Sequence, residues 1–531
     1  MTRMMSATAV LALTAGMAQA EYTLHVLHTN DVHSRIEPIN GFDSTCSAEE
    51  AAENACFGGV ARIASAVNAL RSELEAKGEN VIVLDAGDQF QGSLMYTTYK
   101  GAAEAEFMDK IGYDAMAVGN HEFDDGPQGL ADFLGKVTFP VISGNLDLSR
   151  SNLLKDKVKP YVILEVGGEK IGIVSALATD TVETSSPGPD VIFQDENEAL
   201  AADVAELQAA GVDKIIALTH VGYVKDQDIA AKVPGLDAVV GGHSHTYLSA
   251  TDPERAGPYP TWVDQADGVI VPVVQAYAYS KYLGHLVLTF DDDGNLIYAD
   301  GNTKLLDASV QPDPQIEARV AELAGPIAEL KAKVVAESAE AIDGSRESCR
   351  QQECAMGNLV AEAMLDRVKD QGITIAIQNG GGVRASIDAG PVTMGEVLTV
   401  LPFQNTLSTF EVTGETIVAA LENGVSQVEE GAGRFPQVAG LKYTFDPALP
   451  AGARVTDVMV RNGDGWAPID PAATYGAVSN NYVRGGGDGY KMFVDAANAY
   501  DFGPDLADVT AEYLAKNSPY VPMLDGRITR K

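Results

Sequence analysis

Five short segments in the first half of the chain place histidine, aspartate and asparagine directly after apolar runs that predict strands. The segments are Asn30-Asp31-Val32-His33, Asp85-Ala86-Gly87-Asp88, Gly119-Asn120-His121-Glu122, His220, and Gly241-Gly242-His243-Ser244-His245. They hold five of the eight histidines of the chain, which random placement explains poorly. Because the carboxyl ends of parallel strands in a sheet meet at one crevice, we expect these side chains to converge on a single site.

The chemistry of this set is that of a divalent metal centre. It contains imidazole, carboxylate and amide groups and no thiolate, which suits Zn²⁺, Mn²⁺, Fe or Co²⁺ and argues against a sulfur site. Seven candidate ligands are too many for one ion with open positions, but they suit two ions about 3.5–4 Å apart that share an aspartate. Neighbouring glycines such as Gly87 and Gly242 let the backbone turn sharply between a strand end and an ion.

The elements that must position these residues are those of a layered α/β domain. Strands are predicted at residues 23–28, 80–84, 114–118, 140–143, 214–219 and 237–240. Residues 60–76 carry apolar side chains at helical spacing and predict an amphipathic helix that ends at Gly78. Two later apolar runs, 269–275 and 285–290, predict strands that extend the domain by antiparallel pairing.

A helical repeat over residues 313–334 predicts a connector between two domains. Ile316, Val320, Leu323 and Ile327 recur at helical spacing with charged residues between them. Gly325-Pro326 interrupts the repeat, so a bent helix and two short helices are equally allowed. Beyond it, a predicted helix over 356–369 and a predicted strand over 373–378 open a second α/β region.

Composition limits the classes of function. The 531 residues allow three domains or two large ones, and 46% hydrophobic with 21% charged residues is ordinary for a globular protein. The net charge of −38 repels phosphate polymers and anionic lipid surfaces, so we expect no nucleic-acid polymer as a partner. A small anionic substrate remains possible, because metals and arginines reverse the field inside one cleft.

The N-terminus predicts export. Arg3, the apolar residues 7–18 and the A-x-A site Ala18-Gln19-Ala20 are typical of a secretory signal peptide with cleavage after Ala20. The apolar run is too short to span a membrane, and the polar C-terminus carries neither a stop-transfer helix nor a lipid-anchor signal. We therefore expect a periplasmic or secreted protein without a membrane span.

Four cysteines form two local pairs, Cys46 with Cys56 and Cys349 with Cys354. In an exported chain, an even number at short spacings predicts two disulfides. The rival interpretation, a four-thiolate zinc site, does not fit pairs about 300 residues apart without the tight spacing of such sites.

The five segments, taken in order, resemble the motifs of the calcineurin-like metallophosphoesterases. The likeness continues into the second half, where further motifs resemble the second domain of the 5′-nucleotidases: Cys349-Arg350, Met356-Gly357-Asn358, Asn379-Gly380-Gly381-Gly382-Val383-Arg384, Leu401-Pro402-Phe403 and Gly486-Gly487-Asp488-Gly489. The resemblance covers nearly the whole mature chain. It implies a sandwich-type metallophosphoesterase domain joined by a helical connector to an α/β nucleotide-binding domain.

The resemblance implies two metal sites and a catalytic pair. One ion would be bound by Asp31, His33, Asp88 and His245, and the other by Asp88, Asn120, His220 and His243. Asp88 is then the bridge, and a water or hydroxide held by the metals is the nucleophile for attack on phosphorus. His121 would stabilise the charge that builds up on the phosphate or the leaving group, with Asp124 orienting its ring.

In the second domain the resemblance implies a nucleotide pocket. Phe403 and Tyr482 would stack on the base, where animal relatives carry phenylalanine at the second position. Asp488 would contact the ribose hydroxyls, Asn379 the base or sugar, and Arg350 and Arg384 the phosphate. Arg346 and Asn405 sit at offsets similar to the family's and complete the predicted set.

Other polar residues receive no functional assignment. His25, His28 and His285 lie in or beside predicted strands and are interpreted as packing or hydrogen-bonding residues. Glu122 is left out of the site, as a residue that hydrogen-bonds its loop.

The sequence thus predicts an exported, metal-dependent 5′-nucleotidase that releases phosphate and nucleoside from nucleoside monophosphates. Its predicted parts are a signal peptide (1–20), a metal domain (21–312), a connector (313–334) and a nucleotide domain (335–531), with hinge closure near the connector. A UDP-sugar hydrolase or a 2′,3′-cyclic-nucleotide phosphodiesterase on the same scaffold remains open, as do a thiosulfohydrolase and a catalytically dead binding protein. The metal in the cell, the base preference and the oligomeric state also remain open.

Overall fold

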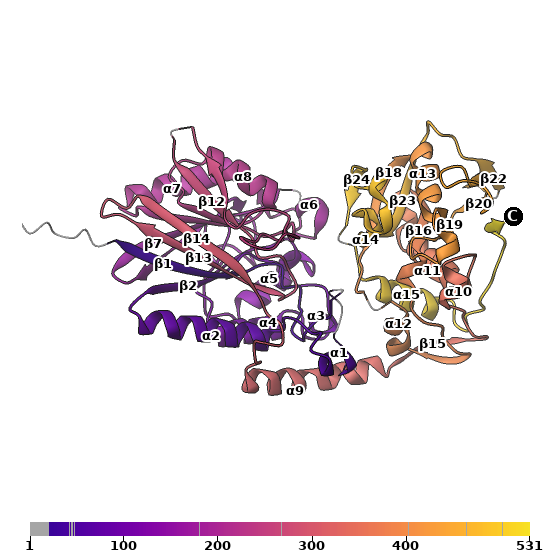
Figure 1. Ribbon diagram of the computed structural model, residues 1–531, viewed down its shortest axis with the longest axis horizontal. Helices are drawn as coiled ribbons and strands as arrows, with labels where there is room; N and C mark the ends of the chain where they lie inside the picture. The colour runs from indigo at the N-terminus through magenta and orange to yellow at the C-terminus, as the bar shows by residue number, and fades with distance from the viewer. Residues whose placement is uncertain are drawn as a thin grey trace, which may run out of the picture.

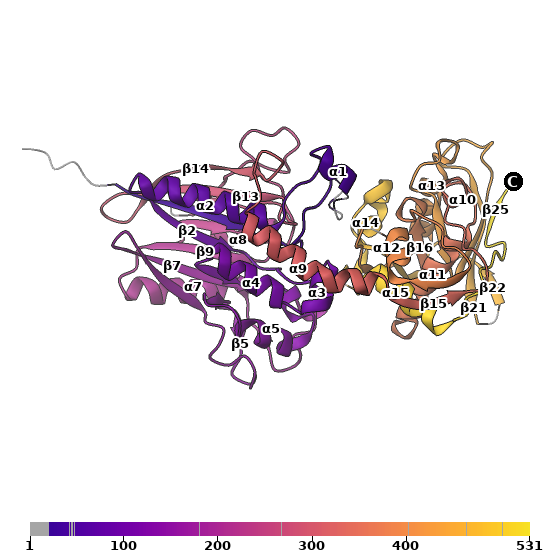
Figure 2. The ribbon, with the colours of Figure 1, turned by 90° about the horizontal axis from the view of Figure 1, so that it is seen from below.

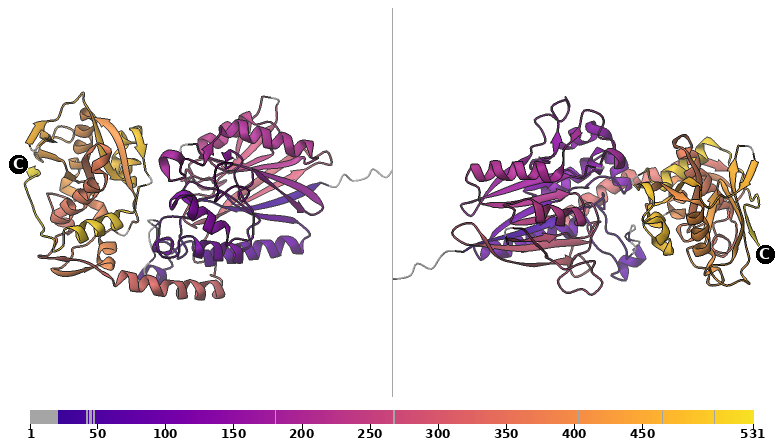
Figure 3. Two further views of the ribbon diagram at one scale, coloured as in Figure 1. Left: turned by 180° about the vertical axis from the view of Figure 1, so that it is seen from behind. Right: turned by 90° about the horizontal axis from the view of Figure 1, so that it is seen from above.

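The computed structural model describes residues 21–531 except 42, 44, 45, 47, 180, 267, 402, 464 and 502. The predicted signal peptide therefore lies outside the described residues. Two α/β bodies are joined by one long helix, α9 (Figure 1). Views from below and from behind show the same division (Figure 2 and Figure 3).

The first body is a sandwich of two six-stranded sheets. The first sheet has the order β14-β13-β1-β2-β3-β4, with β1 (Tyr22–Thr29), β2 (Asn80–Asp85), β3 (Ala115–Ala117), β4 (Val141–Ile142), β13 (Tyr282–Phe290) and β14 (Leu296–Leu305). The second has the order β11-β12-β10-β9-β7-β6, with β6 (Tyr161–Val166), β7 (Glu169–Leu177), β9 (Lys214–His220), β10 (Ala238–Val240), β11 (Thr261–Asp264) and β12 (Ile270–Val274). β1 to β4 are parallel, as are β7, β9, β10 and β12.

Apolar faces hold this sandwich together. Leu24, Ile82 and Leu218 belong to the core between the two sheets. The outer face of the first sheet packs on α2 (Val60–Ala76) and α4 (Ala102–Ile111), and that of the second on α7 (Glu196–Ala209) and α8 (Tyr223–Lys232). The remaining helices and strands of this body are short: α1 (Ala48–Ala52), α3 (Leu94–Tyr99), η1 (His121–Phe123), α5 (Gly126–Leu134), α6 (Thr181–Thr184), β5 (Leu146–Asp147) and β8 (Ile192–Phe193).

The predicted strands of this body are present, but two expectations need correction. The predicted site residues follow strands of two facing sheets rather than one, because β1, β2 and β3 belong to the first sheet while β9 and β10 belong to the second. Of the two late strands, β13 pairs antiparallel with β1 as expected, whereas β12 pairs parallel with β10 and antiparallel only with β11. Strand direction depends on the path of the connecting loop, which the apolar pattern does not encode.

Helix α9 (Pro314–Lys331) is continuous across Gly325-Pro326, so the alternative of two short helices is wrong. The Asp313 side chain caps it by accepting from the backbone N–H groups of Gln315 and Ile316. Its apolar stripe packs against the core of the first body, and Tyr99 donates its hydroxyl to the carbonyl of Leu323. The helix is thus anchored on the first body.

The second body is built on a five-stranded sheet of order β19-β16-β23-β18-β24. Its strands are β16 (Ile373–Asn379), β18 (Leu407–Thr413), β19 (Pro436–Ala439), β23 (Thr474–Asn480) and β24 (Ala497–Tyr500). A four-stranded sheet holds β20 (Leu441–Phe445), β21 (Val455–Asn462), β22 (Gly465–Pro468) and β25 (Ile528–Arg530), and β15 (Val334–Ser338) pairs with β17 (Gly390–Thr393). The helices are α10 (Arg346–Cys349), α11 (Ala355–Val368), α12 (Met394–Val400), α13 (Gly414–Val425), α14 (Asn481–Arg484) and α15 (Leu506–Lys516).

Both predicted disulfides are present, Cys46–Cys56 and Cys349–Cys354. The predicted helix and strand that open the second region correspond to α11 and β16. Within the described residues, no helix combines the length and the apolar character needed to cross a bilayer.

Leu218→Ala tests the core between the two sheets. The side chain is completely buried there, so its truncation leaves a cavity and lowers the free energy of unfolding by about 3 to 5 kcal/mol. Urea unfolding followed by tryptophan fluorescence and circular dichroism measures it. Leu153→Ala, at a position 37% exposed, is the matched control, and equal losses in both variants would contradict the assigned core.

Candidate metal centre and substrate cleft

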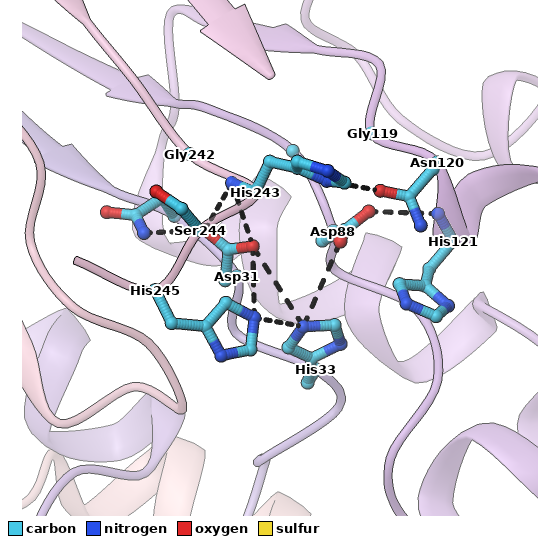
Figure 4. Close-up of polar contacts among 12 residues, drawn as sticks. Asp31, His33, Asp88, Gly119, Asn120, His121, Gly242, His243, Ser244 and His245 are labelled. Carbon is cyan, nitrogen blue, oxygen red and sulfur yellow. Dashed lines mark hydrogen bonds and ion pairs between the residues drawn. The ribbon is translucent and has the colours of Figure 1, made fainter. Parts of the chain in front are cut away.

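The seven predicted metal ligands lie together where the five strand ends meet. Figure 4 labels all of them except His220. Five of them adopt the left-handed backbone region with φ between 50° and 75°: Asp31, His33, Asp88, His243 and His245. Non-glycine residues rarely adopt this region, and such strain concentrates at functional sites. Gly119 is required here, since a Cβ at this position would lie 2.2 Å from Asp88 Oδ1.

One group of ligand atoms consists of Asp31, His33 and His245. His245 Nε2 lies 3.3 Å from Asp31 Oδ1 and 2.9 Å from His33 Nε2. His33 Nδ1 is 3.2 Å from the carbonyl oxygen of Phe90, which leaves Nε2 directed into the group. A carbonyl that fixes the tautomer in this way is a common feature of metal-binding histidines.

A second group consists of Asp88, His220 and His243, with Asn120 beside it. His220 Nε2 lies 3.0 Å from Asp88 Oδ2, and His243 Nδ1 lies 2.8 Å from Asn120 Oδ1. The other nitrogen of His220, Nδ1, lies 2.6 Å from the carbonyl oxygen of Ala86. Asp88 Oδ2 is also 3.8 Å from His33 Nε2, so this carboxylate faces both groups.

Burial and charge make these groups suited to cations. Burial alone would raise the pKa of Asp88, but the charges of His220 and His121 outweigh it and hold that pKa well below its usual range. Burial lowers the pKa of His33 to about 3 and that of His243 to about 4, which leaves neutral imidazoles ready to act as ligands. The nitrogen and oxygen donors fit Zn²⁺, Mn²⁺ or Co²⁺.

His121 and Asp124 form the predicted pair. His121 Nδ1 lies 2.6 Å from Asp124 Oδ2, while Ser185 donates its hydroxyl to Asp124 Oδ1 at 2.8 Å. Burial of His121 opposes its protonation, but Asp124 and Asp88 outweigh burial and raise the pKa of His121 to about 9. The ring is therefore an imidazolium that is held in orientation by a carboxylate.

Glu122 has a larger role than the sequence indicated. Its completely buried carboxylate accepts from four backbone N–H groups, those of Asp88, Gln89, Phe90 and Gly119, at 2.7 to 3.2 Å. This side chain therefore holds the turn after β2 against the turn after β3. A glutamate between a histidine and a phenylalanine gives no local signal of such long-range contacts.

The nucleotide-pocket residues line a cleft of about 770 Å³ to which both bodies contribute. Seven of the eight predicted residues line it: Arg350, Asn379, Arg384, Phe403, Asn405, Tyr482 and Asp488. The side chain of Arg346, the eighth, lies outside the described part of the structure. His245 lines the same cleft, so the group of Asp31, His33 and His245 lies at the edge of the predicted nucleotide pocket.

Several contacts organise the wall formed by the second body. Asn379 donates to Asp488 Oδ2 at 2.7 Å, and the Tyr482 hydroxyl donates to Asp488 Oδ1 at 3.1 Å. The guanidinium carbon of Arg384 lies 5.3 Å from the ring centre of Phe403. Contacts within the protein thus hold the carboxylate of Asp488 and place the cation of Arg384 beside the ring of Phe403.

Apart from His245, sequence reasoning missed the residues that the first body contributes to this cleft: Arg35, Asp43, Tyr277 and Tyr279. Tyr279 lies against the rings of His33 and His245, and the guanidinium carbon of Arg35 is 5.1 Å from its ring centre. The alternation of tyrosine with alanine at residues 276–279 was the available signal, because it places two aromatic rings after a buried strand.

Comparison with known proteins identifies the class and then the family. The family model of the calcineurin-like phosphoesterases matches residues 24–247, and that of the 5′-nucleotidase C-terminal domain matches residues 330–495. Proteins of this class are metal-dependent phosphoester hydrolases, and the sandwich with its histidine and aspartate groups agrees with that class.

Curated relatives extend the match over the chain. A 5′-nucleotidase of Diplobatis ommata is 40% identical, covering 96% of this chain and 90% of its own length, and one of Homo sapiens is 38% identical, covering 98% and 94%. This chain therefore belongs to the 5′-nucleotidase family.

Comparison with solved structures supports the same family assignment. A 5′-nucleotidase precursor from Thermus thermophilus is 41% identical with a TM-score of 0.63, and the NAD nucleotidase of Haemophilus influenzae is 28% identical with a TM-score of 0.76. In each comparison the match covers 96% of this chain and 99% of the other.

Glu122→Gln tests whether this carboxylate holds together the two turns that carry candidate metal ligands. The amide keeps one acceptor oxygen and turns an NH₂ group toward backbone donors, which leaves buried N–H groups unpaired at about 1–3 kcal/mol each. We expect a lower free energy of unfolding and less divalent metal retained after dialysis, measured by denaturation and by plasma mass spectrometry. Glu75→Gln on the exposed face of α2 is the control. Equal metal retention in both variants would contradict the proposed role of Glu122 in holding the two turns.

Proposed function

We propose that this protein hydrolyses nucleoside 5′-monophosphates to nucleoside and phosphate, after export to the periplasm or the medium. The observation that carries the proposal is a cleft in which His245, from the first candidate ligand group, lies together with aromatic and arginine side chains of the second body. Such a cleft suits a ligand with a phosphate at one end and a planar base at the other.

The proposed cofactors are two divalent cations, with zinc, manganese or cobalt as the candidates that suit the donors. Asp31, His33, Asp88 and His245 would hold one, and Asp88, Asn120, His220 and His243 the other. When bound, the cations supply Lewis-acid polarisation of the phosphate and lower the pKa of the attacking water. Asp88 suits the bridging position because its carboxylate faces both groups.

The side chains of this protein orient the substrate. The imidazolium of His121 is proposed to donate to the phosphate or leaving-group oxygen as negative charge builds up there, while Asp124 keeps the ring in place. Arg350 and Arg384 would bind phosphate oxygens, and Asn379 and Asp488 would bind the sugar. Arg346 and Asn405 belong to the same proposed set.

The base would lie between Phe403 and Tyr482, since both rings line the cleft. Tyr482 is 48% exposed, so a stacked base would cover apolar surface that solvent now reaches. Stacking of this kind tolerates different bases.

The proposed domains are 21–312 for the metal centre and 335–531 for nucleotide binding, with 313–334 as connector and 1–20 as signal peptide. Because the two sets of residues sit on separate bodies, we propose that productive binding requires closure near the connector. The comparisons do not favour the UDP-sugar, cyclic-nucleotide or thiosulfate alternatives.

Phosphate release from AMP tests the proposed activity directly. The protein lacking residues 1–20 should release phosphate, lose this activity in a chelator, and regain it when Mn²⁺, Co²⁺ or Zn²⁺ is added back, because the cations polarise the phosphate. Inorganic phosphate is measured colorimetrically, with a no-enzyme control for each metal. Absence of release with every metal tested would overturn the proposal.

His121→Ala tests the proposed role of the imidazolium. We expect kcat for AMP to fall by about 10²–10⁴-fold with a much smaller change in KM, because the lost interaction strengthens as charge develops in the transition state. Steady-state kinetics at saturating metal measures both constants. His25→Gln, on β1 and outside the cleft, is the control, and a kcat for His121→Ala within tenfold of wild type argues against the role.

A further inference from the structure

The loop that carries Arg350 lies at the edge of the cleft, between α10 and α11. The disulfide Cys349–Cys354 closes it, and Cys349 and Cys354 are 0% and 1% exposed. A disulfide limits the shapes of a loop, but it does not attach the loop to the rest of the domain. Contacts with residues outside the loop must therefore determine the position of Arg350 relative to the cleft.

Arg350 itself donates from Nη1 to the carbonyl oxygen of Gly431 at 3.5 Å, and Gln437, in the centre of β19, contacts the main chain of the loop. Its Nε2 donates to the carbonyl oxygens of Cys349 at 3.0 Å and Gln352 at 2.7 Å, and its Oε1 accepts from the N–H of Cys354 at 3.2 Å. The side chain is completely buried. One amide thus binds the loop at both ends and near its middle, and its two donors and its acceptor match the main-chain groups they face.

Two glycines of the sequence motifs leave room for this arrangement. A Cβ on Gly357 would lie 2.3 Å from Gln437 Cγ, so the glycine of Met356-Gly357-Asn358 admits the glutamine side chain. A Cβ on Gly380 would lie 2.2 Å from the carbonyl oxygen of Cys349, so the first glycine after Asn379 lets the loop approach the turn that follows β16.

The same strand pair connects this loop to the other side of the pocket. Gln437 is paired across β16–β19 with Gln378, whose Nε2 donates to the carbonyl of Asn379 at 3.1 Å. Asn379 in turn donates to Asp488. The loop of Arg350 and the Asn379–Asp488 pair are therefore both attached to the same pair of strands, β16 and β19.

We propose that Gln437 is a positioning residue for substrate binding: its amide holds the Cys349–Cys354 loop on β19 so that Arg350 faces the cleft. It contacts no substrate itself. The consequence for phosphate binding rests on the proposed function, whereas the attachment of the loop to β19 does not. Replacement of Gln437 should loosen the loop and weaken binding of the phosphate end of the nucleotide without affecting the base end.

Gln437→Met tests the proposal, because methionine fills similar volume but offers no N–H donor. Gln371→Met, at an exposed position of the same domain, is the matched control. Gln437→Glu, which keeps the acceptor oxygen and replaces the NH₂ donor by a second acceptor oxygen, is used if the methionine variant does not fold. Circular dichroism and thermal unfolding of the full mature chain establish folding first.

The first measurement is the rate at which dithiothreitol reduces each disulfide, followed by alkylation and peptide mass spectrometry. We expect Cys349–Cys354 to be reduced at least fivefold faster in Gln437→Met than in wild type, with Cys46–Cys56 unchanged as the internal reference. Equal rates in both proteins would overturn the attachment of the loop, whatever the substrate of the enzyme is.

The second measurement is steady-state hydrolysis of AMP together with inhibition by adenosine. We expect KM for AMP to rise about tenfold, kcat to change less than threefold, and the inhibition constant of adenosine to change less than twofold. A residue that acts only on stability would not separate these constants. Unchanged KM, or parallel weakening of AMP and adenosine, would overturn the positioning of Arg350.

Discussion

The burial of Asp31 and Asp88 is the constraint on which the rest of the structure depends. A carboxylate removed from water is costly unless charges or hydrogen-bond donors face it. Both carboxylates follow strands of the first sheet, as do two of the imidazoles that face them, those of His33 and His121. The other imidazoles come from β9 and from the loop after β10, which belong to the second sheet. The sandwich is therefore needed for the site as well as for the core, since the first sheet alone lacks His220, His243 and His245. A divalent cation between them would replace protons as the balancing charge.

Local backbone strain follows from the same constraint. Five candidate ligands have backbone angles in the left-handed region, because side chains close together in the sequence, such as those of Asp31 and His33, must point into the same small space. Such strain costs of order 1–3 kcal/mol per residue and persists only where surrounding contacts determine it. Glu122 supplies contacts of this kind by accepting hydrogen bonds from four backbone N–H groups. Packing in the buried interior of the sandwich supplies further contacts.

The strands and the strand-end motifs could be predicted from the sequence because both are local: an apolar run and the residue that follows it. The pairing of β12 with β10 could not, since it depends on the path of a loop between distant segments. Glu122 and Gln437 were missed for the same reason: each acts through main-chain groups far away in the sequence. Phe403 and Asp488 were found only through resemblance to a family, because an aromatic residue in a loop and an aspartate between glycines have ordinary structural explanations.

The charged side chains of the cleft have to bind an anion in a protein that is itself strongly acidic. The chain carries a net charge of −38, which repels a nucleotide phosphate at a distance. Three arginines, Arg35, Arg350 and Arg384, line the cleft against two carboxylates, Asp43 and Asp488, so basic groups outnumber acidic ones there, and bound cations would add to them. On the side of the second body, neutral amides such as Gln437 and Asn379 fix the geometry, and they do so without adding charge that would compete with the phosphate for the arginines. In the second body, uncharged positioning groups beside the arginines thus suit the recognition of an anion inside an acidic protein.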